Sequence, residues 1–170
     1  MSGNRSAARR AVKDWLDAGR IPFLDIIFVA PPLRLDFNRY ASSDEHQAQI
    51  VVFIDDEGEM RMALGGAHGG KKRIDYMVAL EVYYRCLLPD VDQAQDAFDD
   101  LVDAIKARLR ADRRLGISDL SNYGAVVWQA GEGSYGLQID FKDPVDGNVG
   151  GEPIEHYARI RFELTQWITA

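Results

Sequence analysis

The stretch IDYMVALEVYYR at residues 74–85 constrains the fold most, because its side chains alternate in character with a period of two. In a β-strand, successive side chains point to opposite faces. One face of this stretch is apolar or aromatic and consists of Ile74, Tyr76, Val78, Leu80, Val82 and Tyr84. The other face is mixed and consists of Asp75, Met77, Ala79, Glu81, Tyr83 and Arg85. The sequence therefore predicts a long strand with one buried face.

Further strands are predicted on both sides of this one. The segment HYARIRFELTQWI at 156–168 also alternates, and shorter strands are expected at 125–130 and 135–141. The segments QIVVFI (49–54) and EMRMAL (59–64) flank the sequence DDEG, which predicts a β-hairpin. Pro22, Pro31 and Pro32 confine the apolar stretch between them to a loop or a sheet edge.

Two helices are predicted from apolar residues spaced three and four apart. The first covers residues 6–18 and is followed by Gly19, and the second covers residues 92–116 and ends at Gly116. The long helix has its aspartates in the first turns and its lysines and arginines in the last, so both ends complement the helix dipole. Its expected apolar stripe consists of Ala94, Phe98, Leu101, Val102, Ile105 and Leu109.

These elements predict a single α+β domain over residues 1–170. Most links between the strands are of hairpin length, so the sheet should be mostly antiparallel. The long helix and the short N-terminal helix should pack together on one face of the sheet.

Composition excludes several classes of function. A net charge of −7 and an isoelectric point near 4.9 argue against non-specific binding to duplex DNA, which requires clustered cations. No apolar run approaches the ~20 residues that cross a bilayer, and the N-terminus lacks the apolar segment of a signal peptide. The single cysteine, Cys86, fits a reducing compartment. We expect a soluble, intracellular protein without membrane contact.

Residues 65–73, GGAHGGKKR, resemble a phosphate-binding loop, G-x-x-x-x-G-K-[ST], at Gly65, Gly70 and Lys71. Lys72 replaces the hydroxyl residue that would hold Mg²⁺, and the strand predicted from Ile74 replaces the helix whose N-terminus binds phosphate. A nucleotide- or small-molecule-binding domain that uses this loop is therefore the less favoured alternative function.

The sequence predicts no catalytic residue, no cofactor and no metal site. His46, His68 and His156 do not pair with cysteine or with one another at ligand spacing. The acidic segments 55–59 and 143–152 fit solvated loops better than calcium loops, and no G-x-S-x-G motif is present.

Two glycine-rich loops, at 65–73 and 143–152, are predicted to contact a partner. Glycine loses the most backbone freedom on ordering, so a protein that keeps such loops often orders them against another molecule. The predicted contact residues in the first loop are Gly65, Gly66, His68, Gly69, Gly70, Lys71, Lys72 and Arg73. Tyr83, Tyr84, Trp128 and Trp167 are expected in the core or at an interface.

Several segments together resemble the tail terminator (tail completion) proteins of long-tailed bacteriophages, the siphoviruses. The similarity covers nearly the whole chain in the order of elements and in sequence character. It is carried by DAGRIPFLDIIFVAPP, the pattern Y-x-V-x-L-E-V-Y-Y, DAFDDLVDAIKARLRADRRLG, VVWQAGEGSYGLQ and ARIRFELTQWI.

The resemblance implies a non-enzymatic structural protein that assembles with itself into a ring, a homohexamer. Such a ring caps the tail tube, ends tail polymerisation and provides the head-joining surface. The implied partners are the tail tube protein and a head–tail connector protein, with DNA only passing through the lumen. The implied location is the head-proximal end of the virion tail, after assembly in the host cytoplasm. Another head–tail connector or a tail-tube protein of similar plan is the alternative.

Overall fold

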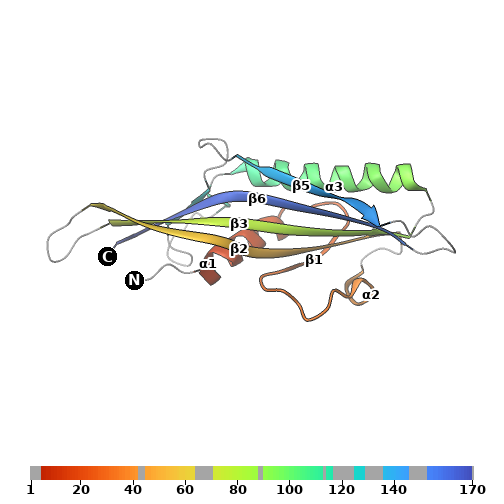
Figure 1. The fold of residues 1–170 in the computed structure, drawn as a ribbon, viewed down its shortest axis with the longest axis horizontal. Coiled ribbons are helices and arrows are strands. Elements are labelled where there is room, and N and C mark those ends of the chain that lie inside the picture. Colours follow the sequence, from red (N-terminus) through yellow and green to blue (C-terminus); the bar gives the residue numbers. More distant parts are fainter. Residues whose placement is uncertain are drawn as a thin grey trace.

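The computed structural model describes residues 5–41, 45–63, 71–87, 90–112, 114–116, 125–128, 136–145 and 153–169. In this part of the chain, one six-stranded sheet runs the length of the molecule (Figure 1). Its strands are β1 (Leu24–Phe28), β2 (His46–Ala63), β3 (Lys71–Cys86), β4 (Ala125–Trp128), β5 (Gln138–Val145) and β6 (Ile154–Thr169). The helices are α1 (Arg5–Asp17), α2 (Phe37–Tyr40) and α3 (Val91–Ala111).

The long strands β2, β3 and β6 form the antiparallel centre of the sheet. The far side of β6 pairs with β5 along one stretch and with β4 along another, both antiparallel. At the opposite edge, β1 pairs with β2 in parallel. The stretch between the prolines is thus an edge strand, which is one of the two predicted possibilities. The prediction of a mostly antiparallel α+β fold is also confirmed.

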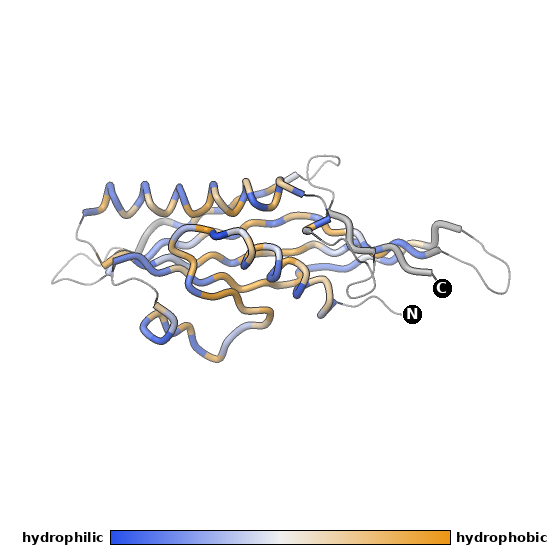
Figure 2. The backbone as a smooth tube through the Cα atoms, turned by 180° about the vertical axis from the view of Figure 1, so that it is seen from behind, coloured by the Kyte–Doolittle hydropathy of each residue, from blue (hydrophilic) through white to orange (hydrophobic). Residues whose placement is uncertain are grey.

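The alternating patterns correctly predict which face of the sheet is buried. All six apolar side chains of β3, from Ile74 to Tyr84, are fully buried, and Ala158, Ile160, Phe162 and Leu164 of β6 continue the same layer. The helices α1 and α3 cover this face, and the expected stripe of α3 is buried in full. Seen from the helix side, hydrophobic and hydrophilic segments alternate along both helices (Figure 2). We call the other side of the sheet the open face.

Trp15 joins α1 to the end of α3. The guanidinium carbon of Arg108 lies 3.3 Å from the centre of a Trp15 ring, which is a close cation–π contact. Trp15 Nε1 donates to the carbonyl oxygen of Arg108 at 2.8 Å, and Arg108 Nε donates to the carbonyl oxygen of Trp15 at 2.9 Å. Gly116 has a φ of +68°, and a Cβ there would lie 2.5 Å from the Trp15 ring. Only glycine fits this position without a shift.

The predicted hairpin around DDEG is wrong. Residues 55–58 lie inside β2, where a register shift between Ile54 and Asp56 accommodates an extra residue. Long-range ion pairs take up the acidic side chains: Asp55 pairs with Arg159, Glu57 with Arg5 and Glu59 with Lys72. The turn-forming composition is therefore overridden by pairing with distant strands. The link between β2 and β3 is residues 64–70, which lie outside the described residues.

The long helix ends at Ala111, earlier than the predicted Gly116. Asp112 is extended, and its carboxylate accepts hydrogen bonds from the backbone nitrogens of Arg114 and Gly116. This local bonding offers the backbone an alternative to another helical turn. At the other end, the Asp90 side chain caps the helix by accepting from Asp92 N and Gln93 N.

Candidate assembly surfaces

The predicted contact residues divide into two groups. Gly65, Gly66, His68, Gly69 and Gly70 lie outside the described residues, as do residues 146–152 of the second glycine-rich loop. Lys71, Lys72 and Arg73 were expected in the loop, but the structure places them at the start of β3. The strand thus begins directly after Gly70. A helix N-terminus, which a phosphate-binding loop requires at this point, is replaced by a strand.

Two of these cations, Lys72 and Arg73, are neutralised within the sheet. Lys72 Nζ lies 2.7 Å from Glu59 on the neighbouring strand. Arg73 bonds Asp75 at 2.7 Å and Glu163 at 3.3 Å, and Asp75 also accepts from Thr165 Oγ1 at 2.6 Å. These side chains tie β2, β3 and β6 together at the end of the sheet where residues 64–70 are attached.

The middle of the open face carries a network of tyrosines and charges. Tyr83 donates to Glu81 at 2.7 Å and packs edge-on against Tyr157, whose ring lies 4.4 Å below Lys142 Nζ. Arg159 Nη2 bonds both carboxylate oxygens of Asp55, at 2.6 and 2.7 Å. Burial, with the Glu81 carboxylate, raises the pKa of Tyr157 to about 12. The phenols therefore stay protonated, and the face presents balanced charges with aromatic area.

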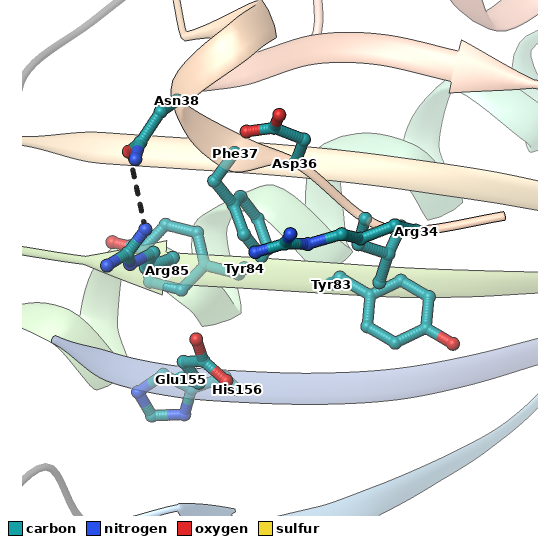
Figure 3. A pocket seen from close by; sticks show the side chains of 10 residues that line it. Arg34, Asp36, Phe37, Asn38, Tyr83, Tyr84, Arg85, Glu155 and His156 are labelled. Carbon is teal, nitrogen blue, oxygen red and sulfur yellow. Dashed lines mark hydrogen bonds between the residues drawn. The ribbon is translucent and has the colours of Figure 1, made fainter. Parts of the chain in front are cut away.

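A cleft of about 420 Å³ opens between the α2 segment and the open face (Figure 3). Asp36 caps α2 by accepting from Arg39 N, while its carbonyl oxygen accepts from the buried Gln49 side chain at 3.0 Å. These bonds hold α2 over β2 and β3. The cleft is lined by residues that include Arg34, Phe37, Asn38, Tyr83, Arg85 and Glu155.

Arg85 is the most constrained charge in this cleft. Its guanidinium carbon lies 5.9 Å from the centre of the Phe37 ring, and Nη1 makes a long contact of 3.5 Å to Asn38 Oδ1. Its Nε is buried and has no hydrogen-bond partner among the described residues. Glu155 lies opposite Arg85 in the strand register, yet no ion pair joins the two. A buried guanidinium nitrogen without an acceptor is costly, so the bonds within the described residues leave Arg85 incompletely satisfied.

On the other side of the sheet, His156 is enclosed by aromatic rings. It stacks on Phe98 at 4.9 Å between ring centroids and lies 5.8 Å from Tyr84, which in turn contacts His46 Nδ1 through its hydroxyl at 2.5 Å. The His156 side chain is buried, and its Nε2 has no hydrogen-bond partner in the part of the chain that the structure describes. Burial lowers the pKa of His156 below its ordinary value. The carboxylate of Asp99 on α3 acts in the opposite direction, but its effect is smaller.

We expect acid to destabilise the protein through His156. Because its pKa is lower in the folded than in the unfolded chain, the unfolded chain binds a proton first as the pH falls below about 6.5. Stability should fall from there by at most about 1.4 kcal/mol per pH unit. Urea unfolding at pH 7.5 and pH 5 should show a smaller pH dependence for His156→Phe than for the wild type. Equal dependence in both would contradict the assignment.

Among the described residues, no group of three histidine, cysteine, aspartate or glutamate side chains is placed to hold a metal ion. No helix in this part of the chain is long and apolar enough to cross a membrane. Cys86, the single cysteine of the sequence, is buried in the core.

Comparisons with known proteins give similarities among solved structures. No family model and no curated protein sequence matches the chain. Among solved structures, the chain is similar to the sheath/tube terminator of an extracellular contractile injection system (PVC) in its extended state, determined by cryo-electron microscopy. The identity is 13% and the TM-score 0.41, and the alignment covers 100% of this chain and 58% of that one. The chain thus spans little more than half the length of that terminator.

Sequence reasoning missed the cleft. No helix or strand is predicted from the sequence over residues 33–40. Asp36 three residues before Arg39 is a helix N-cap pattern that could have indicated α2. Arg85 was placed correctly on the mixed face of its strand, but nothing in the sequence connects it to residues 34–38.

Proposed function

We propose that this chain is a tail terminator: a structural protein that forms a homohexameric ring on the end of a phage-type tail tube. The ring ends tube polymerisation and provides the surface to which the head joins, through a connector protein. The observation that carries the proposal is the resemblance, over nearly the whole chain, in element order and sequence character. Its segments correspond to α1, β1, β3, α3, β4 and β6 of the structure.

The surfaces of the domain support an assembly role. One sheet face is covered by helices, whereas the open face presents Tyr83, Tyr157 and Arg159 in a partly buried network. Tyrosine and arginine are enriched where proteins bind one another. A cyclic ring needs two different patches on each subunit, and an elongated domain with distinct edges can supply them. The acidic composition fits a lumen through which DNA passes without being held.

Electron microscopy of the purified protein tests the proposal directly. We expect rings with a central hole and six-fold symmetry, and light scattering should give a mass of about six subunits. A protein that stays monomeric at high concentration and also fails to stop growth of a purified tail tube would contradict the proposal. Capture of a head–tail connector protein without any effect on tube length would instead favour the alternative connector role.

The glycine-rich link between β2 and β3 gives a second test. Ala63 pairs with Lys71, so deletion of residues 66–70 leaves Leu64 and Gly65 as a two-residue hairpin link. Links of that length with a glycine are common in hairpins, so we expect the free energy of unfolding to change by less than about 1 kcal/mol. Ring formation or control of tail length should be lost. Circular dichroism melting and electron microscopy of tails check the two parts, and normal tails would contradict the contact role.

A further inference from the structure

Two surfaces of opposite charge lie on opposite edges of the sheet. The basic surface consists of Leu33, Arg34, Arg39 and Arg85, on and beside the α2 segment. The acidic surface consists of Asp92, Asp96, Asp99 and Asp100 on α3 with Phe141 on β5. Figure 1 shows α2 beyond the β1–β2 edge and α3 beyond the β6–β5 edge, towards the same end of the sheet.

The basic surface lacks its own counter-charges. Arg34 and Arg39 are exposed, and among the described residues neither they nor Arg85 form an ion pair with a carboxylate. Two carboxylates do lie nearby, but Asp36 is occupied as the cap of α2, and Glu155 is not bonded to Arg85. The buried Nε of Arg85 has no acceptor. Beside these cations, the Leu33 side chain is fully exposed at 110%.

The acidic surface has the opposite charge and likewise lacks counter-charges of its own. Its four aspartates are exposed and lie on the side of α3 away from the buried stripe. Within the described part of the chain, Asp92, Asp96 and Asp100 form no ion pair, and Asp99 accepts only from Gln95 of the same helix. Phe141 is 57% exposed and packs edge-on against Phe98 of α3, so an exposed apolar side chain contacts the helix that carries these carboxylates.

The strand register places both surfaces at one level along the sheet. Gln49, which bonds the backbone of Asp36, is aligned through Tyr83 and Tyr157 with Lys142, the residue next to Phe141. A neighbour that binds at the same level is related by rotation without displacement along the strands. When the rotation axis is parallel to the strands and the rotation closes, a head-to-tail contact of this kind forms a ring, whereas a displaced contact would produce an open helix.

We propose that the acidic surface of one copy binds the basic surface of the next copy in the ring. This inference rests on the proposed function for the ring itself. The aspartates supply the oxygen ligands that Arg34, Arg39 and Arg85 lack, and Leu33 packs against Phe141. The occupant of both surfaces is a second copy of this chain, because each surface carries the charge and the exposed apolar side chain that the other needs.

Charge reversal of each surface tests the contact. One variant carries Asp96→Arg and Asp100→Arg, a second carries Arg34→Asp and Arg39→Asp, and a third carries all four changes. Arg85 is left unaltered because it packs over Phe37 inside the cleft. The control carries Asp14→Arg and Asp17→Arg, which reverse two exposed acids on α1. Association is measured by sedimentation velocity at about 0.1 M salt, where charges act over about 10 Å, and circular dichroism checks the fold of each variant.

Each single-surface variant should associate roughly 100-fold more weakly than the wild type, because like charges then face each other. The four-change variant should recover association, and so should an equimolar mixture of the two single-surface variants. The control should behave as the wild type. If both single-surface variants still form rings as the wild type does, the contact would be overturned and the ring proposal would remain standing. A wild type that is monomeric at millimolar concentration would overturn the contact too, while tube-capping assays would still test the function.

Discussion

Tyr84→Ala is expected to lower the free energy of unfolding by about 3–5 kcal/mol, the range for a large buried aromatic side chain. Tyr84 is fully buried, and its ring contacts Phe23, Phe98 and His156 from three different elements. Its truncation would leave a cavity between the sheet and α3, and His46 would lose its hydroxyl partner. Urea unfolding followed by circular dichroism measures the loss.

Two matched variants separate packing from hydrogen bonding. Tyr84→Phe keeps the ring and should cost about 1 kcal/mol, the typical net value of one hydrogen bond. Tyr83→Ala removes the neighbouring ring, which is partly exposed on the open face, and should cost clearly less than Tyr84→Ala. Equal losses for Tyr83→Ala and Tyr84→Ala would show that the core does not lie on the helix side of β3.

Trp15→Ala is expected to destabilise the fold by about 3 kcal/mol, at the low end for tryptophan because the side chain is only partly buried. The change removes the ring on which the Arg108 guanidinium lies, together with the donor to the carbonyl oxygen of Arg108. It also opens the space beside Gly116. The contact between α1 and α3 should therefore loosen before the sheet unfolds.

Amide hydrogen exchange measures this loosening residue by residue. Trp15→Ala should speed exchange in α1 and in the last turns of α3, with less effect in the β3–β6 pair. Trp15→Phe keeps an aromatic face under Arg108 but loses the indole donor, so it should be intermediate in stability. Uniform acceleration over the whole chain in Trp15→Ala would mean that the two helices do not form a separable unit.

The buried face of the sheet was predictable because alternation is a local property. Each second residue of β3 and β6 is apolar, so the faces can be assigned without knowing any partner strand. The stripe of α3 follows in the same way from spacings of three and four. The end of α3 was not predictable from Gly116, because Asp112 stops the helix first by bonding the backbone ahead of it.

The path of β2 could not be derived from local sequence. Asp55, Asp56 and Gly58 have the composition of a turn, yet Arg159 on β6 and Arg5 on α1 bind the acids of this segment from far away in the chain. The candidate surfaces could not be predicted from the local sequence for the same reason. Arg85 and residues 34–38 meet through the pairing of β2 with β3, and a periodicity within one strand carries no information about that pairing.

The pairing of β3 with β6 has a kinetic consequence. Lys71 pairs with Thr169 and Cys86 with Ile154, so α3, β4 and β5 all lie between the paired strands in the chain. Such non-local contacts form slowly, because the loop between them must close before any pairing is gained. Until residues 154–169 have been synthesised, one edge of β3 stays unpaired and open to other chains. If the chain forms the proposed ring, the supply of subunits competent to assemble is therefore set by a late step of folding.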